Sequence, residues 1–215
     1  MAFDALRQME TWVFDLDNTL YHPSARLFDQ MNRKISAYMI DRLGVSEAEA
    51  DRLRTVYLER HGATLHGLVE DHGVDPDDFL HHVHEIDLSA LKPDPDLTAA
   101  IGNLSGRRII HTNGARAHAE RVLAARGLSH LFDEVYAIED KDLVPKPQAP
   151  AYDKVIAAAG FDPARAAMVE DTEQNLAVPK ARGMATIWVC HQDRKRAPGH
   201  VDHRVTRLAA FLGSL

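Results

Sequence analysis

The stretch TWVFDLDNT at residues 11–19 runs from an apolar segment directly into two carboxylates. Its apolar part, Thr11–Phe14, is short and rich in Trp, Val and Phe, which is typical of a strand covered on both faces. Asp15 and Asp17 stand where this strand ends. In an open α/β sheet, ligands bind beyond the carboxyl ends of the strands, so we expect both carboxylates to face a ligand crevice.

Further apolar runs of four or five residues recur along the rest of the chain. They are Arg108–His111, Glu134–Ile138, Ala166–Val169 and Thr186–Cys190. Helical stretches at Ala115–Arg126 and Gln148–Ala159 lie between the later runs, and Gly127 and Gly160 close them. Strands that alternate with helices favour parallel pairing through right-handed crossovers. The sequence therefore predicts an α/β fold with a doubly wound, Rossmann-like parallel sheet.

The interval Phe28–Leu91 breaks this alternation and contains no strand-like run. An apolar side chain recurs every four residues near its start, which predicts an amphipathic helix; the stripe is Leu27, Met31, Ile35, Met39 and Leu43. A second helix is expected over Glu47–Arg60, and Asp75 followed by proline is typical of a further helix start.

These helices predict a domain inserted into the sheet. We expect residues 1–22 and 92–215 to form the core, and residues 23–91 to form the helical insert. A long crossover packed on the sheet is the alternative interpretation.

Three other strand ends carry polar groups. Thr112 and Asn113 precede a helix, where a hydroxyl and helix N-terminal N–H groups can receive an oxyanion. Lys146 lies between two prolines, which fix the direction of its side chain, and Glu170 and Asp171 end the fourth strand. Each group alone also fits a helix cap or a surface loop. Together with the first carboxylate pair they indicate metal-assisted phosphoryl transfer, and oxygen ligands of this kind suit Mg²⁺.

The composition argues against several other classes of protein. Lys and Arg number 25 against 32 Asp and Glu, for a formal net charge of −7, and no basic run is present, which disfavours nucleic-acid and membrane binding. Cys190 is the single cysteine, so the chain has no internal disulfide framework. No apolar run approaches the roughly 20 residues of a membrane span. We expect a soluble cytoplasmic protein, monomeric or homodimeric, whose partner is a small-molecule phosphate ester.

The four motifs, in this order, resemble the haloacid dehalogenase superfamily of phosphohydrolases. The resemblance covers the whole chain: DLDNT at 15–19, Thr112-Asn113, Lys146 within PKP, and Glu170-Asp171-Thr172 with Asn175. The helical insert resembles the cap domain of the superfamily's first cap class. The resemblance implies that Asp15 is the nucleophile and a Mg²⁺ ligand. It also implies that Asp17 is the general acid and then base, with its backbone carbonyl on the metal.

The same resemblance implies roles for the other strand ends. Thr112 and the Asn113 backbone N–H would hold the phosphoryl oxygens, and Lys146 would neutralise nucleophile and phosphate. Asp171 would ligate Mg²⁺, with Glu170 assisting directly or through water. A dehalogenase needs neither the second acid nor a metal, so these residues favour phosphoryl chemistry.

Within the superfamily the chain looks most like the pyrimidine 5′-nucleotidase group, which implies UMP or CMP as substrate. The stretches that carry this likeness are DLDNTLY at 15–21, 64–68, 84–87 and 111–115 with His118-Ala119. His111 replaces a more usual Phe, and the acid pair at 170–171 also differs from the common one. Candidates for contacts to the leaving group are Tyr21, His22, His66 and Arg116.

Three alternatives remain open from the sequence. One is a phosphatase of another small ester, such as phosphoglycolate or a sugar phosphate. A second is a mutase, because the cap decides whether water or substrate accepts the phosphoryl group. The third is a non-catalytic binding or regulatory module on the same fold. A non-catalytic binding module would be expected to lack the nucleophile or the metal acids, and all are present. A structural zinc site at residues 81–84 or 200–203 is not predicted, because neither segment offers three ligands at a recognised spacing.

Overall fold

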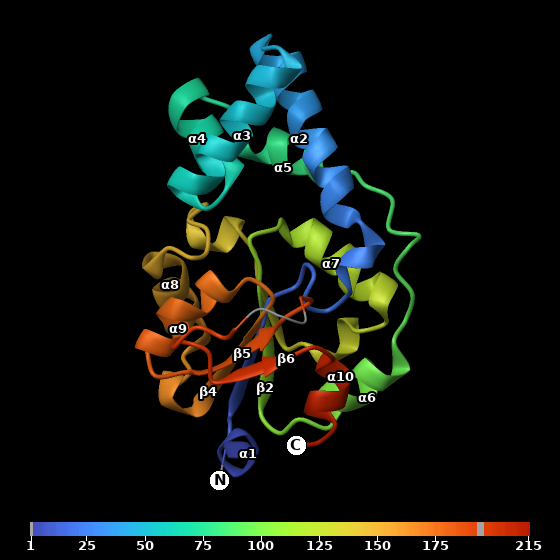
Figure 1. Cartoon of the computed structure of the whole chain (residues 1–215), viewed down its shortest axis with the longest axis vertical. Helices are drawn as coiled ribbons and strands as arrows, with labels where there is room; N and C mark the ends of the chain where they lie inside the picture. The colour runs from blue at the N-terminus through green and yellow to red at the C-terminus, as the bar shows by residue number, and fades with distance from the viewer. Residues whose placement is uncertain (1, 193–195) are drawn as a thin grey trace.

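The computed structural model describes residues 2–192 and 196–215 and shows a sheet-containing core beneath a group of helices (Figure 1). All strands of the described chain pair in parallel, in the order β3-β2-β1-β4-β5-β6. Their bounds are β1 (Thr11–Phe14), β2 (Arg107–His111), β3 (Glu134–Tyr136), β4 (Ala166–Glu170), β5 (Ala185–Val189) and β6 (His203–Val205). The predicted doubly wound parallel sheet is confirmed, and β1 lies at its centre.

Helices cover both faces of this sheet. The core helices are α1 (Ala2–Leu6), α6 (Pro95–Gly102), α7 (Arg116–Arg126), α8 (Ala149–Ala159), α9 (Ala177–Ala181) and α10 (Leu208–Leu212). In Figure 1, α8 and α9 lie on one side of the sheet, whereas α6, α7 and α10 lie on the other. The helices α7 and α8 end at Gly127 and Gly160, whose φ angles of 70° and 65° are the left-handed values that favour glycine.

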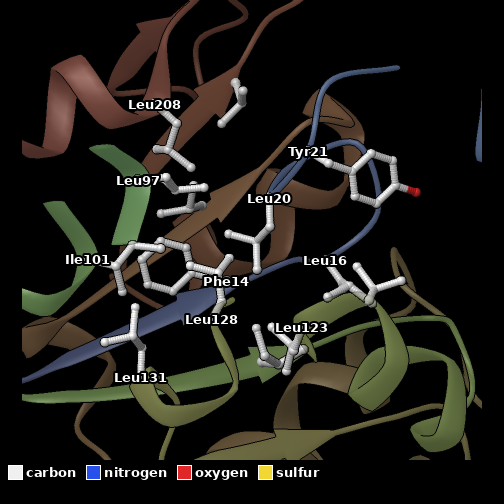
Figure 2. Packing of buried hydrophobic residues seen from close by; sticks show 14 of the residues in the cluster. Phe14, Leu16, Leu20, Tyr21, Leu97, Ile101, Leu123, Leu128, Leu131 and Leu208 are labelled. Atoms are coloured by element: carbon white, nitrogen blue, oxygen red, sulfur yellow. The ribbon is translucent and has the colours of Figure 1, made fainter. Parts of the chain in front are cut away.

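The strand β1 is buried on both faces because its side chains alternate between two apolar clusters. Phe14 belongs to the larger cluster and lies among leucines and isoleucines of α6, α7 and α10 (Figure 2). Val13 points to the opposite face and packs with Val155 of α8. Figure 2 also shows Tyr21 at the edge of the larger cluster, with its hydroxyl directed away from the other labelled side chains. This burial fixes the end of β1, and hence the start of the DLDNT loop.

The inserted helices supply most of a second apolar cluster, which also includes Ala115 and Ile138 of the core. These helices are α2 (Leu27–Leu43), α3 (Glu47–His61), α4 (Thr64–His72) and α5 (Pro76–His84). Tyr38, Met39, Tyr57, Leu68 and Phe79 are among the buried members of that cluster. We call α2–α5 the cap. These helices bury side chains against one another, which fits a separate insert, and the division of the chain at residues 23–91 stays a prediction.

Local signals explain most of the cap helices. Ser46 caps α3 by accepting a bond from the Glu49 N–H, and Asp75 caps α5 by accepting one from the Asp77 N–H. The helix α2 starts as predicted, although Leu27 and Met31 of its stripe pack into the core cluster rather than the cap cluster. That anchoring makes α2 the connection between the two parts.

The helix α4 is not anticipated in the sequence analysis, and its packing depends on a glycine. A Cβ at Gly67 would lie 2.2 Å from Cδ1 of Tyr57, so only glycine lets α4 approach α3 this closely. None of the described helices has the length and apolar character that crossing a membrane requires.

Candidate active site

The polar strand ends meet at one edge of the sheet, as parallel pairing requires. Asp15 follows β1 directly, and its N–H donates to the Val169 carbonyl at 2.9 Å, which extends the pairing of β1 with β4 by one residue. Its side chain accepts a 2.8 Å bond from the Thr19 hydroxyl. Glu170 ends the neighbouring strand β4. The backbone therefore fixes the position of the first carboxylate before any ligand binds.

Lys146 is the positive centre of this cluster. Its ammonium donates to Asp15 Oδ1 and Glu170 Oε2, both at 2.7 Å, and to the His111 carbonyl at 2.8 Å. The residue is only 2% exposed. Burial alone would lower the pKa of Lys146, but the two adjacent carboxylates outweigh it and raise the pKa above its ordinary value. The lysine is therefore a fixed positive charge.

The carboxylates exceed the positive charge available to them. Asp15, Glu170 and Asp171 each offer an oxygen, and these atoms lie within 4.8 Å of one another. Burial and the neighbouring Glu170 raise the pKa of Asp15 to about 7, against the pull of Lys146. Burial and Asp15 raise the pKa of Asp171 to about 9. A buried all-oxygen donor set with excess negative charge fits a hard divalent cation such as Mg²⁺.

Asp17 lies in a separate set of contacts. Its Oδ1 accepts a 2.7 Å bond from the Tyr21 hydroxyl, and His118 Nε2 donates to the same oxygen at 2.8 Å. Burial opposes ionisation, yet His118 and Tyr21 prevail and hold the pKa of Asp17 below its ordinary value. The His118 ring stacks on His84 of the cap at 4.5 Å. The orientation of Asp17 is thus fixed by the core and, one contact further, by α5.

Gly114 leaves space for this arrangement. A Cβ built there would lie 3.2 Å from His118 Cδ2, 3.3 Å from Thr112 Oγ1 and 3.5 Å from Asp17 Oδ2. A side chain at this position would press against the Thr112 hydroxyl and the Asp17 carboxylate. The glycine thus permits the close approach of two site residues.

Hydrogen bonds from Lys141 and Lys146 hold the turn after β2 in place. The Lys141 ammonium donates to the Thr112 carbonyl at 2.7 Å, and burial together with Lys146 lowers the pKa of Lys141 well below its ordinary value. The Asn113 side chain accepts from the Lys146 N–H at 2.8 Å and donates to the Lys146 carbonyl at 3.0 Å. The Asn113 amide therefore clamps the backbone of Lys146, a role that the sequence analysis did not assign to it.

A cavity of about 900 Å³ separates these residues from the cap. Its core side contains the residues of the site: Asp15, Asp17, Thr112, Asn113, Lys146, Glu170 and Asp171. Its cap side is largely apolar and includes Phe28 and Leu58, which are 42% and 46% exposed. Asn32 and Arg60 add polar groups to that roof. The cavity therefore has a charged floor and a mixed roof in which apolar side chains predominate.

The four candidates for leaving-group contacts are not among the described residues that line this cavity. Tyr21 bonds to Asp17, while the His22 ring packs against His191 at a centroid distance of 4.9 Å. Arg116 donates to Asp140 at 2.6 Å, and its second acceptor is a carbonyl of β3. His66 faces two other cap side chains, which are described below. Each candidate has a partner that the sequence analysis did not foresee, and their contact with substrate stays a prediction.

The sequence analysis did not assign a site role to His118, His84, Phe28 or Leu58. His118 lies in the first turn of α7, where its ring reaches Asp17 after the end of β1. Phe28 is apolar but lies outside the buried stripe of α2, and that position is a signal that could have marked it.

Comparison with known proteins agrees with this fold. The family model of the haloacid dehalogenase-like hydrolases matches residues 9–183, and the chain belongs to this family. Phosphate metabolism protein 8 of Saccharomyces cerevisiae is 28% identical over 196 residues, which cover 83% of this chain and 60% of that protein. The chain thus matches less than two thirds of that relative. A phosphoglycolate phosphatase of Mesorhizobium japonicum is 28% identical over 184 residues, with coverage of 82% and 81%.

Solved structures show the same fold. The L-2-haloacid dehalogenase of Xanthobacter autotrophicus superposes with a TM-score of 0.60 at 19% identity, covering 95% of this chain and 97% of that one. A phosphatase structure shares the fold as well. Since both reaction types occur on this fold, the fold leaves the reaction open and the site residues have to decide it.

Proposed function

We propose that the protein is a Mg²⁺-dependent phosphomonoesterase that forms an aspartyl-phosphate on Asp15. The observation that carries this proposal is the pairing of Asp15 with the buried Lys146 at 2.7 Å, beside Glu170 and Asp171. The ammonium lies where it would neutralise both the nucleophile and an incoming phosphate. A bound Mg²⁺, held by Asp15, Asp171, Glu170 and the Asp17 carbonyl, would supply charge neutralisation for the phosphoryl oxygens.

In the first step a carboxylate oxygen of Asp15 bonds to phosphorus while the bond from phosphorus to the leaving oxygen breaks. Asp17 gives its proton to that leaving oxygen. The contacts of Asp17 favour its charged form, so the proton has to come from solvent, and the negative phosphate bound beside Asp17 would raise its pKa and favour that uptake. Thr112 and the Asn113 N–H would hold the phosphoryl oxygens during the transfer.

In the second step Asp17 accepts a proton from water, and the water oxygen attacks phosphorus. The bond from phosphorus to Asp15 breaks, which restores the carboxylate and yields inorganic phosphate. Tyr21 and His118 keep Asp17 in one orientation through both steps, because each holds Oδ1. The oxygen Oδ2 then faces the space beside Thr112 and Gly114.

The choice between phosphatase and dehalogenase rests on two features. A dehalogenase requires no acid at the position of Asp17 and no metal, whereas this chain has a positioned Asp17 and a three-carboxylate cluster. The phosphoglycolate phosphatase among its relatives also supports a phosphatase rather than a dehalogenase. A non-catalytic module would have no use for a lysine and a nucleophile held at hydrogen-bond distance.

For the substrate, we propose a pyrimidine 5′-nucleotide, UMP or CMP. The roof supports this choice, because an exposed aromatic ring such as Phe28 can stack on a base. Phosphoglycolate is the second candidate because a relative carries that name, and a sugar phosphate is a third. A two-carbon ester would leave the apolar roof without a partner, so the cavity favours the larger nucleotide.

The proposal includes a cap of residues 23–91 that excludes water from the closed site. A cytoplasmic location and a monomeric or homodimeric state also belong to the proposal.

Phosphate release from UMP, CMP, AMP, GMP, phosphoglycolate and sugar phosphates tests both levels of the proposal. We expect turnover with Mg²⁺, none with chelator, and a preference for UMP and CMP. Asp15→Asn should abolish turnover of every substrate without unfolding the chain. Activity that survives chelation or this substitution would contradict the mechanism, whereas another preferred ester would contradict only the substrate assignment.

A further inference from the structure

A second group of metal-ligand side chains lies in the cap, apart from the carboxylates of the core. His61 ends α3, and His66 and Glu70 lie one turn apart on α4. Each offers one ligand atom, and the three atoms lie within 4.8 Å of one another. The two imidazole rings are 4.9 Å apart between centroids. Two helices therefore converge on one small polar site.

The buried nitrogen of His61 is the strongest sign that the site takes a ligand. The His61 side chain is only 10% exposed, and its Nε2 is buried without a hydrogen-bond partner among the described residues. The nearest acidic oxygen, Glu70 Oε2, is 3.7 Å away, which is too far for a hydrogen bond. A buried polar nitrogen without a partner is costly, so a group that bonds to it would relieve that cost.

The spacing suits a tetrahedral metal ion. Zn²⁺ takes His nitrogens at about 2.0–2.1 Å and carboxylate oxygens at about 2.0–2.2 Å, so its ligand atoms lie roughly 3.4 Å from one another. The 3.7 Å separation of His61 Nε2 and Glu70 Oε2 is close to that value. Three protein ligands leave a fourth position for water.

The chemistry of the donors separates this site from the one in the core. Two imidazoles and one carboxylate favour Zn²⁺, Co²⁺ or Ni²⁺, whereas Mg²⁺ prefers oxygen donors alone. The core cluster has three carboxylates and no imidazole. The two groups share no residue, and their donor atoms suit different metals.

We propose that His61, His66 and Glu70 form a second metal site, for a zinc-type divalent ion, at the junction of α3 and α4. The packing of Gly67 against Tyr57 brings the two helices close enough for the three side chains to meet. The site gives His66 a role in the cap in place of contact with substrate.

The ion would also act on the position of the cap. The turn between α3 and α4 rests on the loop that carries Lys146: Gln148 donates to the His61 carbonyl at 2.9 Å. A Cβ at Gly62 would lie 3.0 Å from Cδ of Pro147, so the two backbones are in close contact there. His61 and the turn also line the cavity. A metal that ties α3 to α4 would hold this turn against the catalytic loop.

The test is metal binding by the full chain after removal of metals with chelator. Equilibrium dialysis against Zn²⁺, with excess Mg²⁺ present to occupy the carboxylate site, should give one tightly bound Zn²⁺ per chain. Even the loss of an outer group that only orients a metal ligand costs about 10–100-fold in metal affinity. Glu70→Gln and His66→Asn remove ligands themselves, so each should weaken Zn²⁺ binding at least tenfold. Co²⁺ in place of Zn²⁺ should give the visible absorption of a tetrahedral complex.

Two control variants test whether the ion binds at the proposed site rather than elsewhere. His81→Asn removes an exposed histidine of α5, and Asp171→Asn alters the core cluster; both should leave Zn²⁺ binding unchanged. Circular dichroism checks that each variant is folded. Absence of tight Zn²⁺ binding by the wild-type chain would overturn the proposal, as would equal binding by Glu70→Gln and His66→Asn. Since the readout is binding, it is independent of whether the protein is a phosphatase.

Discussion

The core and the cap contribute to the cavity in different ways. In the core, Lys146 lies 2.7 Å from two carboxylates and Asp17 has two donors within 2.8 Å, so its charged groups are held in a bonded network. In the cap, Phe28 and Leu58 present apolar surface that is more than two fifths exposed. In the proposed mechanism the reaction would therefore depend on the fixed charges of the core, whereas the leaving group would meet apolar surface of the cap.

The comparison predicts that core substitutions reduce kcat and cap substitutions change KM. Asp17→Asn keeps the shape of the side chain but removes its acid and base functions. We expect kcat to fall by about 10²–10⁴-fold, the contribution typical of general acid–base catalysis. Steady-state kinetics with UMP and with p-nitrophenyl phosphate measures it. p-Nitrophenyl phosphate has a better leaving group, so its first step should slow less than that of UMP. If Asp17→Asn raised KM equally for both esters and left kcat unchanged, the assigned role of Asp17 would be refuted.

The charge excess in the core gives a second prediction, which concerns pH. The carboxyl pKa values of Asp15 and Asp171 are raised from 3.8 to about 7 and about 9. Above pH 3.8 and up to these raised values, the folded chain therefore keeps protons on the two groups that the unfolded chain has lost. The free energy of unfolding therefore falls as pH rises from about 4 toward 9 when no metal is bound. Mg²⁺ should restore it, with a larger increase in Tm at pH 8 than at pH 5.

The variant Asp171→Asn sharpens this second prediction. It removes one of the repelling carboxylates, so its metal-free Tm at pH 8 should exceed that of the wild-type chain, while the Mg²⁺-induced increase should shrink. Thermal unfolding with and without Mg²⁺ measures both. A variant that is less stable without metal, or that responds fully to Mg²⁺, would show that Asp171 is not part of a repelling metal site.

The smallest expected effect belongs to the cap. Phe28→Ala should raise KM for UMP about tenfold, since base–aromatic stacking is worth about 1–3 kcal/mol and tenfold corresponds to about 1.4 kcal/mol. Turnover of glycerol phosphate, which has no ring, should change little, and Phe28→Tyr should restore the KM for UMP. If both esters responded alike, Phe28 would be packing the cap rather than contacting a base.

The sequence could predict the sheet and the polar strand ends because these depend on short local patterns. The run from Thr11 to Asp17 contains both the strand and its carboxylates, and Gly127 and Gly160 end helices where expected. The pairing of Asp17 with His118 joins residues 101 positions apart, so no local pattern could reveal it. The helix α4 likewise depends on contact between Gly67 and Tyr57.

The substrate side of the site was harder to predict for the same reason. Tyr21 donates a hydrogen bond to Asp17 and Arg116 forms an ion pair with Asp140, two contacts that the local sequence did not reveal; a contact of either residue with the leaving group stays a prediction. The residues that line the roof come from separate cap helices and meet only after the cap folds. The shape of this roof therefore depends on tertiary packing that a single sequence does not display.

The central claim is that Asp15 carries the phosphoryl group during turnover. The most direct test is acid quenching of the wild-type enzyme during turnover of its best substrate, followed by mass spectrometry of the peptide that contains residues 11–19. We expect one added phosphoryl group on Asp15, which should be absent in Asp15→Asn and in the wild-type chain without substrate. Turnover with no phosphoryl group on this peptide, or with the group on another residue, would contradict the covalent mechanism.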